Sequence, residues 1–143
     1  MSDTPELKIF QLPPQTIPTL WPPLRAKLKP AIDRMRGLVT ERVTLERLAS
    51  GERQCWVAYS GTELKAAIVT RILTAEGGQR LLEAVLGGGD DRRLWQRPIV
   101  ERLKRFMEEE RCEAFRIIGR KGWERVYPEF KPEQIVLEYR PHG

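Results

Sequence analysis

The sequence predicts a mixed α/β (α+β) protein in which helices flank a mixed sheet of about six strands. Three β-rich runs separated by glycine-containing turns follow one another between Gln54 and Leu86, and such hairpins force antiparallel pairing. An amphipathic helix from Arg93 to Arg111 then leads to a short apolar run, Ala114 to Gly119. Because a helical crossover joins parallel neighbours, the fourth and fifth strands, which flank this helix, are expected to be parallel. With 143 residues, 41% of them hydrophobic, the chain is expected to form one domain over residues 1–143.

A strand and two helices are expected before this antiparallel meander. Glu6 to Leu12 alternates apolar and polar residues, and the two prolines that follow end the strand because proline cannot donate to a ladder. Thr16 is expected to cap the first helix, which Pro30 is expected to kink or divide. The second helix is expected to begin at Thr44 as its cap.

The three strands of the meander are expected at Gln54 to Tyr59, Leu64 to Ala75 and Gln79 to Leu86. The three glycines that follow are expected to break the sheet, and Asp90 or Asp91 is expected to cap the helix after them. Beyond the fifth strand, the sequence predicts a short helix from Gly122 to Tyr127 and a final strand, Gln134 to Arg140, that closes the domain.

The composition favours a protein of the cytoplasm. No run approaches the roughly 18 to 20 apolar residues of a membrane-spanning helix, and the N-terminus lacks the basic and then apolar order of a signal peptide, so no membrane partner is expected. The isolated Cys55 and Cys112 are expected to be reduced and buried.

The net charge of +5 arises from 25 basic and 20 acidic residues that are interleaved along the chain. A basic cluster surrounds Trp123, and two interpretations of it stay open, a nucleic-acid patch or ordinary solvated charge. The mixed charge pattern favours solvated charge, so nucleic acid is not an expected partner. The cluster consists of Arg116, Arg120, Lys121 and Arg125.

The predicted order is strand, two helices, three antiparallel strands, helix, strand, short helix and strand. This order resembles the fold of the GNAT superfamily of N-acetyltransferases over nearly the whole chain. The stretches LWPPL, QCWVAY and EAFRIIGRKGWERVYPEF are similar to parts of the small GNAT-like proteins of tailed phages and prophages.

The resemblance implies that acetyl-CoA binds where the fourth and fifth strands separate, with its pyrophosphate at the loop and helix start after the fourth strand. The corresponding residues here are Leu86, Gly87, Gly88, Gly89, Arg92 and Arg93. The family's usual Gly-x-Gly or Gly-x-Ala signature is absent, and Asp90 and Asp91 would repel a phosphate. A glycine turn with an acidic helix cap is therefore the alternative interpretation.

Transfer of an acetyl group to an amine requires a general base, and an acid can protonate the leaving thiolate. Glu83 is the candidate base, since neighbouring apolar residues would raise the pKa of its carboxyl, and a cross-strand ion pair with Arg71 or Arg80 is the alternative. Tyr127 resembles the family's general acid, and a core or hinge tyrosine is the alternative.

No other catalytic or metal-binding motif is present. The single histidine, His142, is the penultimate residue, which disfavours a catalytic triad. No metal ligand set and no metal cofactor are expected.

Two functions therefore stay open, so that catalysis itself is undecided. In the first, the protein is an acyltransferase with acetyl-CoA and an amine acceptor as substrates. In the second, it is a non-catalytic phage or prophage accessory protein, cytoplasmic or associated with the virion, that binds a phage or host protein. In that case Trp21, Trp95 or Trp123, expected to be exposed, would anchor the partner.

Overall fold

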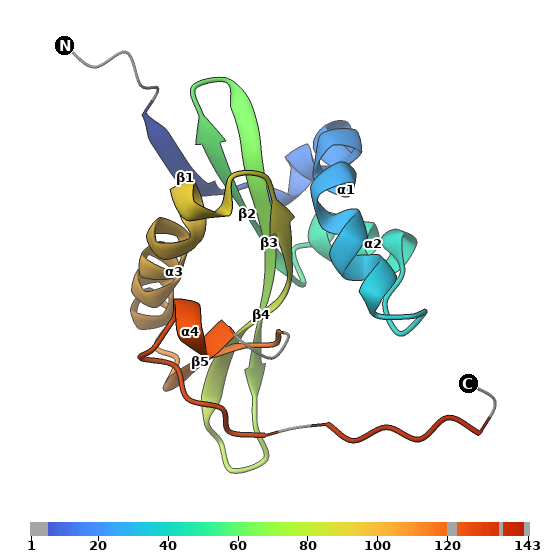
Figure 1. The fold of residues 1–143 in the computed structure, drawn as a ribbon, viewed down its shortest axis with the longest axis vertical. Coiled ribbons are helices and arrows are strands. Elements are labelled where there is room, and N and C mark those ends of the chain that lie inside the picture. The colour runs from blue at the N-terminus through green and yellow to red at the C-terminus, as the bar shows by residue number, and fades with distance from the viewer. Residues whose placement is uncertain (1–5, 120–122, 135, 142–143) are drawn as a thin grey trace.

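The computed structural model describes residues 6–119, 123–134 and 136–141. Figure 1 shows a sheet with helices on both of its faces. The elements in chain order are β1 (Leu7–Gln11), a 3-10 turn (Pro14–Thr16), α1 (Ile17–Arg34), α2 (Glu41–Ala49), β2 (Gln54–Ser60), β3 (Glu63–Thr74), β4 (Arg80–Gly89), α3 (Arg92–Glu109), β5 (Ala114–Ile117) and α4 (Trp123–Val126).

The sheet has the order β1-β2-β3-β4-β5. Its first four strands pair antiparallel, and β4 pairs parallel with β5, which confirms the predicted meander and the parallel pair. The expected sixth strand is wrong for the described residues, since residues 134 and 136–140 belong to no strand or helix. The sheet among the described residues therefore has five strands and ends at β5.

Two apolar cores lie on opposite faces of the sheet. α1 and α2 cover one face, where Leu24, Leu28 and Val69 belong to the core. α3 covers the other face, where Trp56 and Leu103 are buried. Figure 1 shows this arrangement directly, with α3 on one side of the strands and α1 and α2 on the other. The alternation of side chains along the central strands feeds both cores, because successive residues of a strand point to opposite faces.

The three glycines after Leu86 do not break the sheet, contrary to expectation. They are the last three residues of β4, and each pairs with β3, Gly88 with Ala67 and Gly89 with Ala66. A Cβ atom on Gly88 would lie 2.2 Å from the backbone oxygen of Lys27 in α1. The glycines therefore serve close packing of backbone on backbone, a recognised use of glycine within a strand.

Several predicted helix ends are also corrected. Thr16 stands at the N-terminus of α1 without accepting a capping hydrogen bond, and Pro30 does not divide this helix. The cap of α2 is Thr40, whose Oγ1 accepts a hydrogen bond from the backbone N–H of Val43 at 3.2 Å. Thr44 is buried inside α2 and donates its hydroxyl proton to the carbonyl of Thr40.

Candidate functional site between β4 and β5

The sheet opens between its last two strands, because β4 and β5 stay paired over only four residues. The pairing runs from Leu81 opposite Ala114 to Ala84 opposite Ile117, after which β4 continues to Gly89. A register shift in the pairing of β3 with β4 falls at the same place and leaves Val85 without a partner in β3. Such a bulge bends its strand and increases the local twist. Beyond Ala84, the edge of β4 that faces β5 therefore has no strand partner among the described residues.

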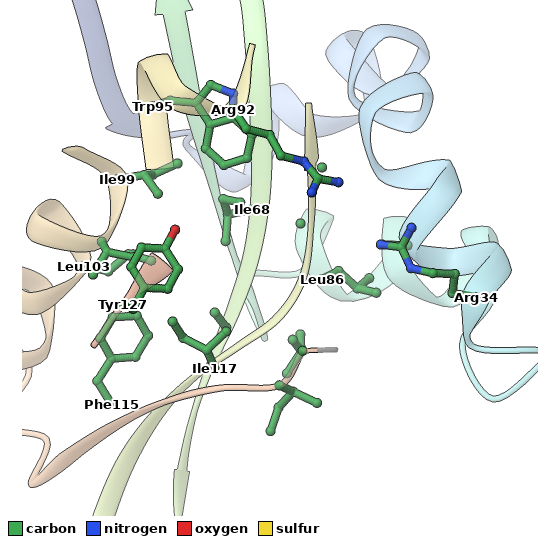
Figure 2. Close-up of a pocket in the computed structure, with 18 of the residues that line it drawn as sticks. Arg34, Ile68, Leu86, Arg92, Trp95, Ile99, Leu103, Phe115, Ile117 and Tyr127 are labelled. Carbon is green, nitrogen blue, oxygen red and sulfur yellow. The ribbon is translucent and has the colours of Figure 1, made fainter. Parts of the chain in front are cut away.

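A pocket of about 400 Å³ occupies this division. Figure 2 shows it between α3 on one side and the C-terminal end of α1 on the other, with β4 and β5 between them. Most of its lining is apolar, and α3 contributes four buried side chains. The apolar lining residues include Ile68, Val85, Leu86, Trp95, Ile99, Val100, Leu103, Phe115, Ile117 and Ile118.

Two arginines bring positive charge to this apolar pocket. Arg34 is the last residue of α1, and Arg92 is the first residue of α3. Both line the pocket, and Figure 2 shows their guanidinium groups on the side of the pocket near the C-terminal part of β4. A guanidinium group presents several N–H donors to phosphate or carboxylate oxygens. The site thus combines an apolar chamber with two groups suited to an anion.

The predicted cofactor residues divide into two groups. Leu86, Gly87, Gly88 and Arg92 line the pocket, whereas Gly89 and Arg93 do not. Because the glycines belong to β4, they do not form a phosphate-binding loop in front of α3. The glycine turn, which was the alternative interpretation, is wrong for the same reason.

The two aspartates before α3 are held by lysines from neighbouring elements. Asp90 forms an ion pair with Lys27 of α1, and the hydrogen bond from that lysine lowers the pKa of the Asp90 carboxyl. Asp91 accepts a hydrogen bond from Nζ of Lys65 at 2.7 Å. Asp91 stands at the N-cap position of α3 but makes no side-chain capping hydrogen bond, so the predicted acidic cap is wrong. The lysines balance the negative charge that would otherwise face an anion near the pocket.

Glu83, the candidate base, lies outside the pocket lining. Its side chain is 1% exposed and accepts hydrogen bonds from Nε of Arg71 at 2.8 Å and from Nε of Arg116 at 2.9 Å. Burial acts to raise the pKa of this carboxyl, but the hydrogen bonds and charges of the two arginines outweigh burial and lower it. The expected raised pKa of Glu83 is therefore wrong. Of the two arginines considered as its cross-strand partner, Arg71 pairs with Glu83. Arg80 pairs with Glu110 instead.

Tyr127, the candidate general acid, lines the pocket. It is buried, and its hydroxyl donates a hydrogen bond to the backbone carbonyl of Gln96 at 3.1 Å. Burial raises the pKa of Tyr127 to about 12, so the phenol holds its proton firmly. Its ring lies 5.8 Å from that of Phe130, centroid to centroid. Tyr127 thus has the contacts of a core tyrosine at the wall of the pocket, and a role as general acid stays a prediction.

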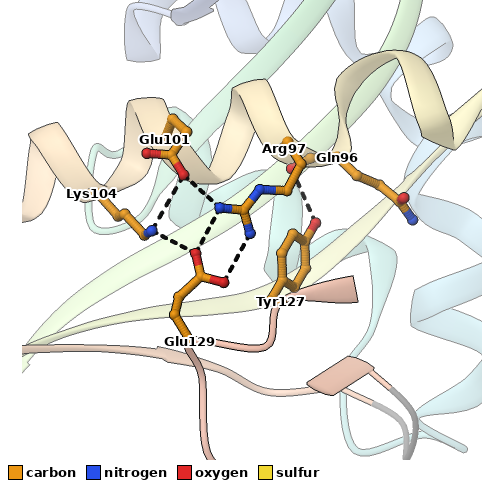
Figure 3. A network of polar contacts seen from close by, with 6 residues as sticks. All are labelled: Gln96, Arg97, Glu101, Lys104, Tyr127 and Glu129. Carbon is orange, nitrogen blue, oxygen red and sulfur yellow. Dashed lines mark hydrogen bonds and ion pairs between the residues drawn. The ribbon is translucent and has the colours of Figure 1, made fainter. Parts of the chain in front are cut away.

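A polar network fixes the chain after α4 onto α3. Figure 3 shows the Glu129 carboxylate between Arg97 and Lys104, with Glu101 beside them. Glu129 accepts hydrogen bonds from both nitrogens of the Arg97 fork at 2.9 and 2.7 Å. Hydrogen bonds from Arg97 and then from Lys104 hold the pKa of Glu129 far below its ordinary value. This network, together with the Tyr127 hydrogen bond, keeps the aromatic wall of the pocket against α3.

Apart from Arg92, sequence reasoning missed the residues that α1 and α3 contribute to the pocket. Arg34 is distant in sequence from β4 and belongs to no recognisable motif, so nothing in the sequence identifies it as a pocket residue. Trp95 is 3% exposed and lines the pocket, and Trp21 is half-buried against the α1 core, so neither is the exposed anchor that was expected. The side chain of Trp123 lies outside the described residues, as do Arg120 and Lys121.

Both cysteines are buried and unpaired, as the sequence predicted. In the part of the chain that the structure describes, no group of three or more His, Cys, Asp or Glu side chains is placed to hold a metal ion. No helix among the described residues is long and apolar enough to cross a membrane.

Comparison with known proteins shows likeness in structure. No protein-family model matches the chain. No curated protein is similar to it in sequence. Solved acetyltransferase structures superpose over nearly the whole chain, at sequence identities that show the fold alone.

An aminoglycoside acetyltransferase, HMB0005, from an uncultured soil metagenomic sample has a TM-score of 0.70 at 16% identity, covering 94% of this chain and 97% of that one. A second aminoglycoside acetyltransferase, meta-AAC0020, from a like source and crystallised with trehalose, has a TM-score of 0.67 at 18% identity, covering 94% and 95% of the two chains. A predicted acetyltransferase from Clostridium acetobutylicum, crystallised with acetyl-CoA, has a TM-score of 0.66 at 14% identity, covering 94% and 96%. The chain therefore has the fold of acetyltransferases of the GNAT type.

Proposed function

We propose that this protein binds a coenzyme A thioester, with acetyl-CoA as the first candidate, in the pocket between β4 and β5. The observation that carries the proposal is the pocket of about 400 Å³ with apolar walls and two arginines in its lining. The acetyltransferase from Clostridium acetobutylicum, which has the same fold, was crystallised with acetyl-CoA, and this supports the choice of ligand.

The chemistry of the pocket matches the parts of such a ligand. The thioester and its pantetheine arm are largely apolar and flexible, and the arm contains two amide groups. Val85 and the residues after it present the strand edge that β5 leaves unpaired, so their backbone groups are available to these amides. Arg34 and Arg92 are suited to the phosphates. They take the place of the absent glycine loop as the source of anion binding.

The same pocket is poorly equipped for transfer to an amine. No Asp, Glu or His is among the described residues that line it. An alkylammonium acceptor must lose a proton before it can attack the thioester, so a base within hydrogen-bond reach is needed. Two arginines bind Glu83 and lower the pKa of its carboxyl, and the raised pKa of Tyr127 means that its phenol retains its proton. We therefore propose binding with slow or no transfer, in agreement with the non-catalytic alternative drawn from the sequence.

The resemblance to phage and prophage proteins belongs to this proposal. A domain that keeps the fold and the pocket but not the base is suited to sensing a CoA thioester or to binding a phage or host protein. Its location, in the cytoplasm or with the virion, stays a prediction.

Thermal unfolding with and without acetyl-CoA tests the binding. At 100 times its Kd, a ligand that binds only the folded protein stabilises it by about 2.7 kcal/mol. Arg92→Ala is expected to weaken binding at least tenfold, whereas Arg93→Ala, the adjacent arginine outside the pocket, is the matched control and is expected to bind like the unaltered protein. No stabilisation at millimolar acetyl-CoA would overturn the proposal.

Release of free CoA from acetyl-CoA, measured with a thiol reagent and a panel of amines, tests the second half of the proposal. A rate close to the uncatalysed one is expected. Rapid release that depends on an added amine would show that the protein is an efficient acetyltransferase.

A further inference from the structure

A row of charged side chains crosses the sheet outside the pocket. This arginine row consists of Arg53, Arg71, Glu83 and Arg116. In the sheet register, Arg71 of β3 lies opposite Glu83 of β4, and Glu83 lies opposite Arg116 of β5. Arg53 directly precedes β2, and the charges of Arg71 and Glu83 both act on it. None of the four residues belongs to the lining of the pocket between β4 and β5.

The arginine row lies on the face of the sheet that carries α1 and α2. The neighbours of Glu83 in β4, Leu82 and Ala84, pack in the core under α3. Because successive residues of a strand point to opposite faces, Glu83 and the arginines that bind it lie on the other face. Figure 1 shows the hairpin of β3 and β4 reaching past α1 and α2. The side chains of Arg71 and Arg116 are 42% and 41% exposed, so a ligand can reach them from solvent.

Glu83 holds the two exposed guanidinium groups in place. One oxygen of its buried carboxylate accepts a hydrogen bond from Nε of Arg71 at 2.8 Å, and the other accepts one from Nε of Arg116 at 2.9 Å. Glu83 also contacts Nη2 of each group. A guanidinium group has five N–H donors, and among the described residues Nη1 of neither group has a hydrogen-bond partner. Both groups thus present free donors in a fixed orientation.

The arginine row carries more positive charge than its one carboxylate balances. Arg53 is partly buried, and its guanidinium group forms no ion pair with any described residue. The nearby Glu52 pairs with Arg47 instead, at 3.8 Å. Burial, and then the charges of Arg47 and Arg71, lower the pKa of Arg53. Three guanidinium groups against one carboxylate leave two positive charges, and a bound anion relieves the repulsion between them.

A phosphate monoester matches this surplus better than a carboxylate does. At pH 7 it carries a charge of about −1.5 to −2 and three acceptor oxygens. A carboxylate carries a single charge and two oxygens. Because guanidinium groups bind phosphate oxygens through paired N–H donors, each of the three arginines can bind an oxygen of its own.

We propose that the arginine row binds a phosphate monoester, carried by a small molecule or by a phosphorylated protein side chain, at a site separate from the pocket for the CoA thioester. Arg71 and Arg116 bind it through Nη1, and Arg53 supplies the remaining positive charge. Binding at the arginine row is independent of acetyl-CoA, because none of its residues lines the pocket.

An NMR titration with inorganic phosphate tests the site, with chloride at the same ionic strength as the reference. The Nε–H signals of Arg53, Arg71 and Arg116 are expected to shift together and to saturate. The signal of Arg105, which is exposed on α3, is expected to stay unchanged. Absent shifts, or equal shifts with chloride, overturn the proposal, because the row then carries only solvated charge.

Arg53→Ala is the decisive variant, since this arginine has no ion pair whose loss would destabilise the fold. It is expected to weaken phosphate binding about tenfold and to leave Tm without phosphate unchanged or higher. Arg105→Ala is the matched control and is expected to bind phosphate like the unaltered protein. Equal affinities of these two variants for phosphate overturn the proposal.

Two further ligands identify the source of the phosphate. Glucose 6-phosphate represents a phosphorylated metabolite, and a phosphoserine peptide represents a modified protein. The one that binds more tightly identifies the source, and binding of either that Arg53→Ala weakens supports the site.

Saturating acetyl-CoA tests whether the two sites are separate. The phosphate titration is expected to be unchanged in its presence. Loss of phosphate binding overturns the proposal, because the arginine row then holds the phosphates of the cofactor itself. A protein that binds phosphate at the arginine row but fails to bind acetyl-CoA contradicts only the proposed function.

Discussion

Gly88→Ala is expected to destabilise the protein because there is no room for a side chain between α1 and β4. The added Cβ would lie 2.2 Å from the carbonyl oxygen of Lys27 and 3.4 Å from its carbonyl carbon, and both atoms belong to the backbone of α1. A helix backbone cannot rotate away as a flexible side chain can, so α1 must shift from the sheet. Overpacking of this kind costs about 1–3 kcal/mol.

A loss of about 2 kcal/mol corresponds to a fall in Tm of roughly 7 °C for a chain of this size. Calorimetry or circular dichroism against temperature measures it, and urea unfolding at 25 °C checks the free energy. Gly77→Ala is the matched control, since its Cβ would meet no atom within 4 Å, and its stability is expected to stay within about 0.5 kcal/mol of the unaltered protein. Equal stability of the two variants would refute the account of Gly88 as a packing glycine.

Further predictions concern buried groups. Glu83→Gln removes the charge that Arg71 and Arg116 share but keeps a hydrogen-bond acceptor. Because both arginines remain partly in water, the loss is expected to be about 1–2 kcal/mol in urea unfolding, and a neutral result would refute these charge-assisted hydrogen bonds. Because the pKa of Glu83 is lowered by folding, these pairs stabilise the protein above the ordinary glutamate pKa of about 4.3, and this contribution is lost as the pH falls through the lower folded pKa, so Glu83→Gln should flatten the acid limb of a stability profile. Tyr127→Phe loses the hydrogen bond to Gln96 and is expected to cost about 1 kcal/mol, measured in the same way, and no loss would contradict that bond. Burial raises the pKa of Cys55 to about 12, so thiol reagents at pH 8 should modify it only on unfolding, and rapid labelling of the folded protein would contradict its burial.

Features that depend on local sequence patterns were predicted correctly, whereas features that depend on contacts between distant parts of the chain were not. The meander and the parallel pair were predictable because alternation, glycine turns and a crossover helix are local patterns with few solutions. The end of β4 was not, because glycines mark a turn in most local contexts. Here they are required by the approach of α1, which arrives from a distant part of the chain.

The same difference between local patterns and distant contacts applies to the residues of the site. Leu86 and Gly88 were predicted from their position after the fourth strand, and they line the pocket. Arg34 was not predicted, since its place in the pocket depends on where α1 ends in space. Glu83 was assigned a raised pKa from its apolar sequence neighbours, but strand neighbours point to opposite faces. The residues that set its pKa are Arg71 and Arg116, on the strands at either side.

By itself, the sequence determined the order of the main helices and strands, the mixed sheet and the parallel pairing of its fourth and fifth strands, because these follow from periodicity and chain connectivity. The tertiary structure alone decided which charges meet and where the sheet opens, because hydrogen bonds, ion pairs and close packing depend on distances between segments far apart in the chain. It also decided that the last apolar segment lies unpaired in solvent, although its sequence has the pattern of a strand, because pairing requires a neighbour that the sequence does not specify.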